Sequence, residues 1–193
     1  MSATLANILE DAKAMLAAKA QEFGIDVNEL AQEEITEIRE NKREFVKSDE
    51  LTALAEKYAW DVAPVLDAVD EWIPEPDIEV STTNEVLAVL HWYRFFIAAK
   101  IERGLHGIAD EDGDENFEQL ADPQSDANGS IKTALIAIER SILAWTFLLT
   151  QSNADSLRPF IQLLELIKRK AEDKFPRARD FIRPGFDEID VVM

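Results

Sequence analysis

Residues 85–100 read EVLAVLHWYRFFIAAK, and residues 131–149 read IKTALIAIERSILAWTFLL. In the first stretch large apolar side chains occupy every side of a helix, and only one arginine and one histidine interrupt them. In the second, apolar residues recur at alternating steps of four and three, which is typical of a helix-packing seam. We therefore predict two central, fully packed helices, over residues 84–106 and 130–150.

The composition of the whole chain agrees with an all-α fold. The chain has 193 residues, of which 47% are hydrophobic, and it contains only six Gly and seven Pro. This length suits a single domain. Ala, Leu and Glu, which lose little entropy in a helix, are plentiful. We predict an all-α, single-domain helical bundle of about six helices.

Several features indicate a soluble, cytoplasmic protein. The sequence does not start with the basic residues and apolar run of a secretory signal. The absence of Cys excludes disulfides and thiolate metal sites. Residues 131–149 contain Lys132, Glu139 and Arg140, each of which would be costly inside a bilayer. We therefore expect no membrane partner.

The N-terminal third shows a break and an unusual helix. Pro74 and Pro76 predict an extended connection over residues 74–80, so residues 1–73 are a candidate helical subdomain. Within it, a helix that begins after Gly24 carries a narrow apolar stripe between charged residues. Such a stripe suits docking of another helix, and it comprises Leu30 or Ala31, Ile35, Ile38 and Phe45.

Charge is distributed unevenly along the chain. Residues 108–129 contain many Asp and Glu but no Lys or Arg, which predicts a flexible acidic loop. The C-terminal tail, residues 168–193, concentrates positive charge instead. We expect this basic tail to pair with the acidic loop, within one molecule or across a dimer. Its basic patch comprises Lys168, Arg169, Lys170, Lys174, Arg177, Arg179 and Arg183.

Charged residues inside the two apolar helices predict a buried polar network. A charge without a partner in such a place is strongly unfavourable, so pairing is expected. We predict that Arg94 pairs with Glu139 or another acid across the helix interface. Such a pair would fix the register of the two helices, and a ligand pocket is the alternative. The network comprises Arg94, Glu139, Arg140 and His91.

Two acidic motifs raise a metal-dependent alternative. Residues 33–37 read EEITE, which places two glutamates one turn apart on a predicted helix, and residues 67–70 read DAVD. These motifs resemble the two metal-binding motifs of the all-α nucleotide pyrophosphohydrolases, although Asp67 stands where that family has Glu. The resemblance covers only these two short stretches. It implies hydrolysis of nucleotides with a magnesium ion bound by Glu34, Glu37, Asp67 and Asp70.

Net charge and motif content narrow the function classes. The net charge of −19 disfavours nucleic acid and anionic membranes as partners, because both are polyanions. The sequence contains no nucleophile beside a base, no Gly-rich phosphate loop and no established metal spacing. We therefore assign no catalytic residue and no cofactor. We expect a non-enzymatic protein-binding or self-associating module, with the magnesium-dependent pyrophosphohydrolase as the alternative.

Overall fold

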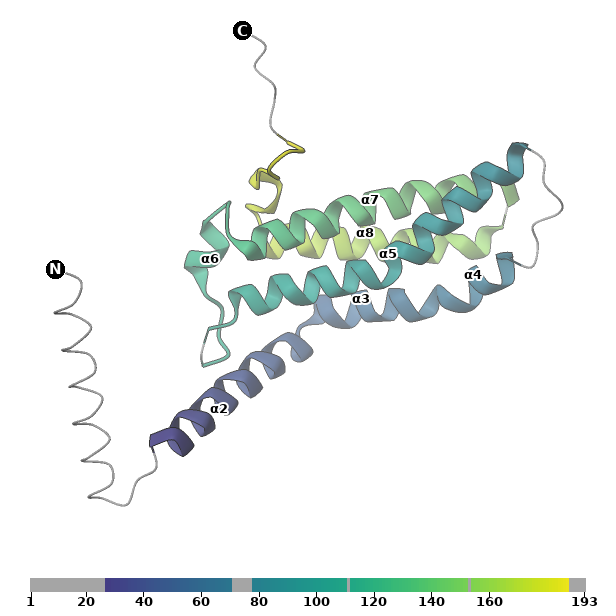
Figure 1. Cartoon of the computed structure of the whole chain (residues 1–193). Helices are drawn as coiled ribbons and strands as arrows, with labels where there is room; N and C mark the ends of the chain where they lie inside the picture. Colours follow the sequence, from purple (N-terminus) through teal and green to yellow (C-terminus); the bar gives the residue numbers. More distant parts are fainter. Residues whose placement is uncertain (1–26, 71–77, 111, 153, 188–193) are drawn as a thin grey trace, which may run out of the picture. The chain divides into compact units, whose positions relative to one another are not determined.

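The computed structural model describes residues 27–70, 78–110, 112–152 and 154–187, which are mostly helical (Figure 1). Among these residues there is no β-strand, only an isolated β-bridge that joins Ala109 to Glu115. The predicted all-α bundle is therefore confirmed. The helices are α2 (Val27–Ser48), α3 (Glu50–Asp61), α4 (Ala63–Asp70), α5 (Ile78–Ile108), α6 (Phe117–Ala121), α7 (Asp126–Ser152) and α8 (Arg158–Lys174), with 3-10 turns η1 (Asp155–Leu157) and η2 (Ala178–Asp180).

The chain divides into two compact units, Met1–Asn41 and Lys42–Met193. The division falls inside α2, so α3 and α4 belong with the later helices. The subdomain that we expected over residues 1–73 is therefore not the unit that the structure defines. In the described part of the first unit, Ile35 is exposed on α2. Most of the expected connection over residues 74–80 lies outside the described residues.

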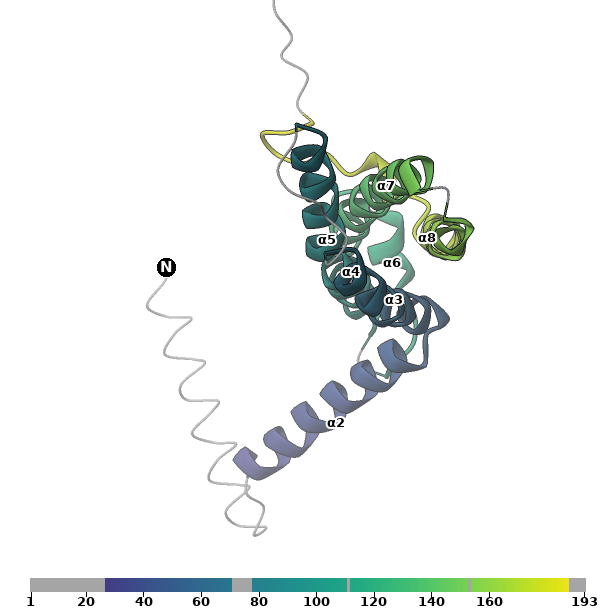
Figure 2. The same ribbon diagram turned by 90° about the vertical axis from the view of Figure 1, so that its right-hand side faces the viewer.

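The second unit is a four-helix bundle in which α3 with α4 makes one rod and α5, α7 and α8 make the others. The rods contact each other in a ring, α3 with α5, α5 with α7, α7 with α8, and α8 with α3. Successive rods run in opposite directions (Figure 1), and Figure 2 shows α8 nearly end-on beside α7, with α5 and α3 inclined to it. This up-down-up-down order needs only short connections at the two ends of the bundle.

The closest packing joins α5 to α7, and two glycines permit it. A Cβ atom on Gly104 would lie 2.6 Å from Cδ1 of Ile131, and one on Gly107 would lie 3.0 Å from Cβ of Ala127. At this crossing the absence of a side chain lets the two helices approach. The helix therefore continues through Gly107 to Ile108, beyond the end that we predicted at residue 106.

Both central helices are longer than predicted. Helix α5 begins at Ile78 rather than near residue 84, because no Pro or Gly occurs between Pro76 and Gly104 to prevent it. Helix α7 begins at Asp126 rather than near residue 130, so Gly129 is inside it. The C-terminal end of each helix lies within two residues of its predicted position.

Trp145 contacts two other rods at the centre of the core, one through a hydrogen bond and one through its ring. Nε1 of Trp145 on α7 donates a hydrogen bond to the hydroxyl of Tyr58 on α3, at 3.0 Å. The Trp145 ring also stacks on Phe160 of α8, with ring centroids 5.1 Å apart. Burial raises the pKa of the Tyr58 hydroxyl to about 12, although hydrogen bonds with Trp145 and Ser141 act in the opposite direction.

Candidate functional site

Helix α5 is not covered on every side, contrary to our prediction that both central helices are fully packed. Its Trp92 side chain is 71% exposed and its Phe95 side chain is 44% exposed. The ring of four rods explains this result: among the described helices α5 packs mainly against α3 with α4 and against α7, with α6 near one end, and Trp92 and Phe95 stay exposed. Helix α7 has more buried residues, spread from Ala127 to Leu148, but it is not fully packed either, since Leu143 is 70% exposed.

The exposed apolar residues of α5 form one continuous stripe. Ala88, Trp92, Phe95 and Ala99 are all exposed and follow one another at steps of four, three and four. Residues at this spacing lie on one side of a helix, in the arrangement that packs against a second helix. On the adjacent rod, Trp60 of α3 is 67% exposed. We call these five residues the aromatic strip.

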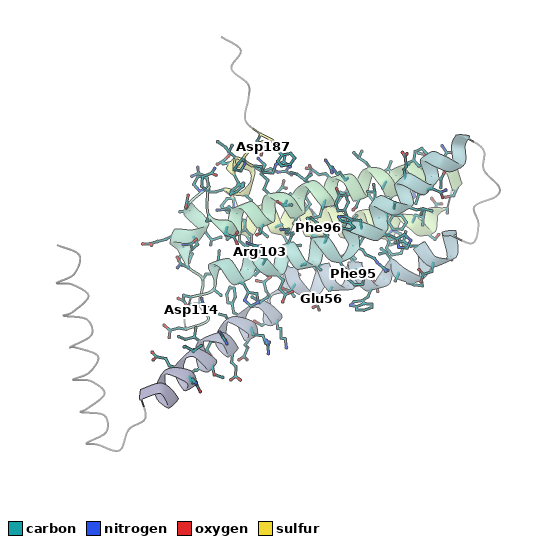
Figure 3. The ribbon with its side chains drawn as sticks, in the orientation of Figure 1. Glu56, Phe95, Phe96, Arg103, Asp114 and Asp187 are labelled. Carbon is teal, nitrogen blue, oxygen red and sulfur yellow. The ribbon has the colours of Figure 1, made fainter. Side chains whose placement is uncertain are left out.

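The strip is continuous from α3 to α5. The rings of Trp60 and Phe95 meet edge to face, with centroids 5.3 Å apart and planes at 77°. The guanidinium carbon of Arg94 lies 4.7 Å from the centroid of the Phe95 ring. Phe95 on α5 and Glu56 on α3 are labelled in Figure 3. Phe95 therefore contacts both Trp60 and Arg94, whereas Trp92 is the most exposed of the three aromatic side chains.

Carboxylates border the aromatic strip. Glu56 precedes Trp60 by one turn on α3, and Asp67 follows it on α4. Glu85 and Glu102 lie before and after the exposed stripe of α5. All four side chains are exposed, and we call them the carboxylate rim. Within the described chain, Glu56, Asp67 and Glu85 form no ion pair, and Glu102 contacts only His106, at 3.9 Å.

The predicted polar network is not present as one cluster. Arg94 does not pair with Glu139, so that prediction is wrong. Among the described residues, Nε and Nη1 of Arg94 have no hydrogen-bond acceptor although both atoms are buried. Arg140 instead donates from Nη1 to the hydroxyl of Tyr93, at 2.7 Å, near the surface. His91 is half-buried on α5.

Glu139 belongs to a different ion-pair network because its side of α7 faces α8 and η2. It accepts from Arg179, at 2.7 Å, and from Lys168, at 3.0 Å, and Arg179 also contacts Glu172, at 2.6 Å. The hydrogen bond from Arg179 lowers the pKa of Glu139 below its ordinary value, with burial opposing it and Lys168 reinforcing it. The network connects α7, α8 and η2.

The acidic segment over residues 108–129 has a defined path where we expected a flexible loop. Oδ1 of Asp110 accepts hydrogen bonds from the backbone of Asp112, at 3.0 Å, and Asp114, at 2.8 Å, in a tight turn. Helix α6 follows. The fully buried side chain of Asn128 then donates to the carbonyl of Asp122, at 2.7 Å. Polar side chains therefore supply the backbone partners that an irregular loop lacks.

Six of the seven residues of the basic patch form ion pairs within the molecule. Lys174 forms ion pairs with Glu115 of the acidic segment and with Asp49, at 3.0 Å. Burial alone would lower the pKa of Lys174, but hydrogen bonds from Lys174 to Glu115 and Asp49 outweigh it, and the pKa is raised. Three further residues of the patch also pair with acids of the same molecule: Lys170 with Glu50, Arg177 with Asp180, and Arg183 with Asp187. Arg169 forms no ion pair with a described residue, and the other six residues make internal contacts, of which the Lys174–Glu115 pair is the predicted one.

Replacing Lys174 with Met is expected to lower the free energy of unfolding by about 1–2 kcal/mol, because Asp49 and Glu115 are left partly buried without their cation. Chemical denaturation followed by circular dichroism measures the change. Lys170→Met is the matched control, because its partner Glu50 is 68% exposed and such pairs contribute less than about 1 kcal/mol. Equal effects of the two substitutions would contradict a special role of Lys174.

The four residues of the magnesium alternative lie on two helices. Glu34 and Glu37 are exposed on α2, and Asp67 is exposed on α4. Asp70 is the last residue of α4, and its side chain is outside the described set. Among the side chains that are described, no group of three or more His, Asp or Glu residues has an arrangement suited to a metal ion. The metal site stays a prediction, and pyrophosphate release from nucleoside triphosphates with magnesium is its assay.

Comparison with known proteins gives no family: no protein-family model, characterised protein or solved structure matches the chain. Helix α7 is long and apolar enough to span a membrane by length and composition. Its packing is that of a core helix, because Ile131, Ile138 and Trp145 are fully buried against other helices.

Proposed function

We propose that the protein is a non-enzymatic helical module that binds a helix of another protein through the aromatic strip. The observation that carries this proposal is the exposure of Trp60, Trp92 and Phe95 on adjacent rods. Large contiguous apolar surfaces are rare on soluble monomers and mark interaction sites. Tryptophan is also the side chain that most often dominates binding energy at interfaces.

The geometry of the strip favours a helix as the bound element. Its residues on α5 alternate in steps of four and three, which is the spacing of a helix-packing seam. The small Ala88 and Ala99 leave room on either side of Trp92 and Phe95. A helix that crosses here would add a further rod to the outer side of the bundle, where α5 has no neighbour within the described unit.

Site-specific photocrosslinking in cells tests this function. A photoreactive phenylalanine analogue at Ala99 is expected to link the protein to a partner that mass spectrometry identifies. The same analogue at Ala121, which is exposed on α6 outside the strip, is the matched control. Adding Trp92→Ser is expected to reduce the crosslinked product at Ala99 at least tenfold, because a central Trp contributes about 2 kcal/mol or more to binding.

Binding of the purified partner completes the test. Trp92→Ser and Trp60→Ser are each expected to weaken it about 30-fold, whereas Phe117→Ser removes an aromatic ring that is 74% exposed on α6 and should have no effect. Circular dichroism checks that every variant is folded. Crosslinks of equal yield at Ala99 and Ala121, or a yield at Ala99 unchanged by Trp92→Ser, would exclude the strip as the binding surface.

A further inference from the structure

We propose that the element bound by the aromatic strip is a basic amphipathic helix, with an apolar seam flanked by Lys and Arg. This inference rests on the proposed function and specifies its partner. The exposed stripe from Ala88 to Ala99 covers about three helical turns, or roughly 16 Å. A partner helix of similar length, with apolar residues at steps of three and four, can cover it.

The charged residues around the strip determine which sign of charge the partner helix should carry. Glu56, Asp67 and Glu85 are exposed and form no ion pair with any described residue. Of the nearby cations, Lys57 pairs with Asp61, and Arg103 pairs with Asp126 at 2.8 Å. Arg94 lies against the Phe95 ring and Lys100 against the Phe96 ring, and neither forms an ion pair with a described residue. The four carboxylates of the rim outnumber these two cations, so the surface that a docking helix meets has a net negative charge.

A second copy of this chain is a poor occupant. Each molecule has a formal net charge of −19, so two copies that meet through the strip would bring two carboxylate rims together. The basic tail cannot offset this repulsion, because its Lys168, Lys174 and Arg179 are paired with acids of the same molecule. A basic helix, in contrast, gains apolar contact and ion pairing in the same complex.

Three peptides of 21 residues and the full-length protein test the inference. The first has an apolar seam with Lys on both flanks, the second has the same seam with Glu flanks, and the third has the composition of the first in scrambled order. Fluorescence anisotropy at about 0.1 M salt measures their dissociation constants. We expect the basic amphipathic peptide to bind at least tenfold more tightly than either of the others.

Neutralising the rim provides the second measurement. The triple variant Glu56→Gln, Asp67→Asn, Glu85→Gln is expected to weaken binding of the basic peptide about tenfold and to reduce its salt dependence, because rim charges act through long-range attraction. The matched control also removes two glutamates and one aspartate, but outside the rim, through Glu118→Gln, Asp173→Asn and Glu165→Gln. These side chains are exposed on α6 and α8, and the control should bind as the wild type does.

The outcomes separate the partner's chemistry from the proposed function. Equal binding of the acidic and basic amphipathic peptides would overturn the inference and leave the strip as a binding surface. A dimer in sedimentation experiments that Trp92→Ser dissociates would also overturn it, because the occupant would be a second copy. If the scrambled basic peptide binds as tightly as the basic amphipathic peptide, recognition depends on charge alone. That result would overturn both the inference and the proposed function. If no peptide binds, the inference fails and the crosslinking experiment decides the function.

Discussion

Replacing Trp145 with Ala is expected to lower the free energy of unfolding by about 3–5 kcal/mol. The Trp145 side chain has no exposed surface and is among the largest buried groups of the bundle. The substitution would leave a cavity between three rods, because the indole contacts Tyr58 of α3 and Phe160 of α8. It would also remove the donor that serves the buried Tyr58 hydroxyl, which adds a desolvation cost.

Urea denaturation at neutral pH measures this effect. Leu143→Ala is the matched control, because Leu143 lies two residues earlier on the same helix and is 70% exposed. That substitution should change stability by less than about 1 kcal/mol. A Trp145 variant as stable as the Leu143 variant would mean that α3, α7 and α8 do not meet around this side chain, and the arrangement of the bundle would have to be revised.

Replacing Gly107 with Leu is expected to lower the free energy of unfolding by about 2–3 kcal/mol. A Cβ atom there would lie 3.0 Å from Cβ, 3.3 Å from Cα and 3.4 Å from the backbone nitrogen of Ala127. Two of these three atoms belong to the backbone of α7, so the helices must separate to admit a larger side chain. Leu has a higher helix propensity than Gly by nearly 1 kcal/mol, which reduces the net loss but does not reverse it.

The adjacent position provides the control for the Gly107 variant. His106→Leu adds an apolar side chain to the same turn of α5, but His106 is exposed and faces solvent. It is expected to leave stability within about 0.5 kcal/mol of the wild type. Thermal and urea unfolding of both variants make the comparison. A Gly107→Leu protein that is as stable as His106→Leu would show that α5 and α7 are further apart at this crossing.

Residues 85–100 and 131–149 predicted the fold because both are too apolar for a helix that is exposed on most of its surface. Trp145 and Ile138 are fully buried as the seam spacing of α7 requires. The same reasoning was wrong for Trp92 and Phe95, since an apolar residue on every side of α5 indicates burial only if enough neighbours exist to cover it. The spacing of Ala88, Trp92, Phe95 and Ala99 was a readable signal. It was hidden because the rest of α5 is equally apolar.

The charged residues show the opposite case. Lys174 and Glu115 were expected to attract each other, and they are in contact. The prediction that Arg94 pairs with Glu139 is wrong, because the sequence of α7 does not show which of its sides faces α5. Glu139 instead faces Lys168 and Arg179, which come from later in the chain. Composition therefore predicts that such charges need partners, whereas the partners depend on the angles at which the helices pack.

By itself, the sequence determined that this protein is all-α and that residues near Tyr93 and Trp145 lie on its two long central helices. It predicted a contact between the acidic and basic segments without deciding between one molecule and a dimer, and the Lys174–Glu115 pair lies within one molecule. These features follow from helix propensity and hydrophobic periodicity, which depend on residues close together in the sequence. The attraction between opposite charges also needs no particular orientation of the helices. Only the tertiary structure decided which side of α5 remains exposed beside Trp60. A ring of four rods leaves each rod an outer side, and which side faces outward depends on long-range packing between α3, α5 and α7.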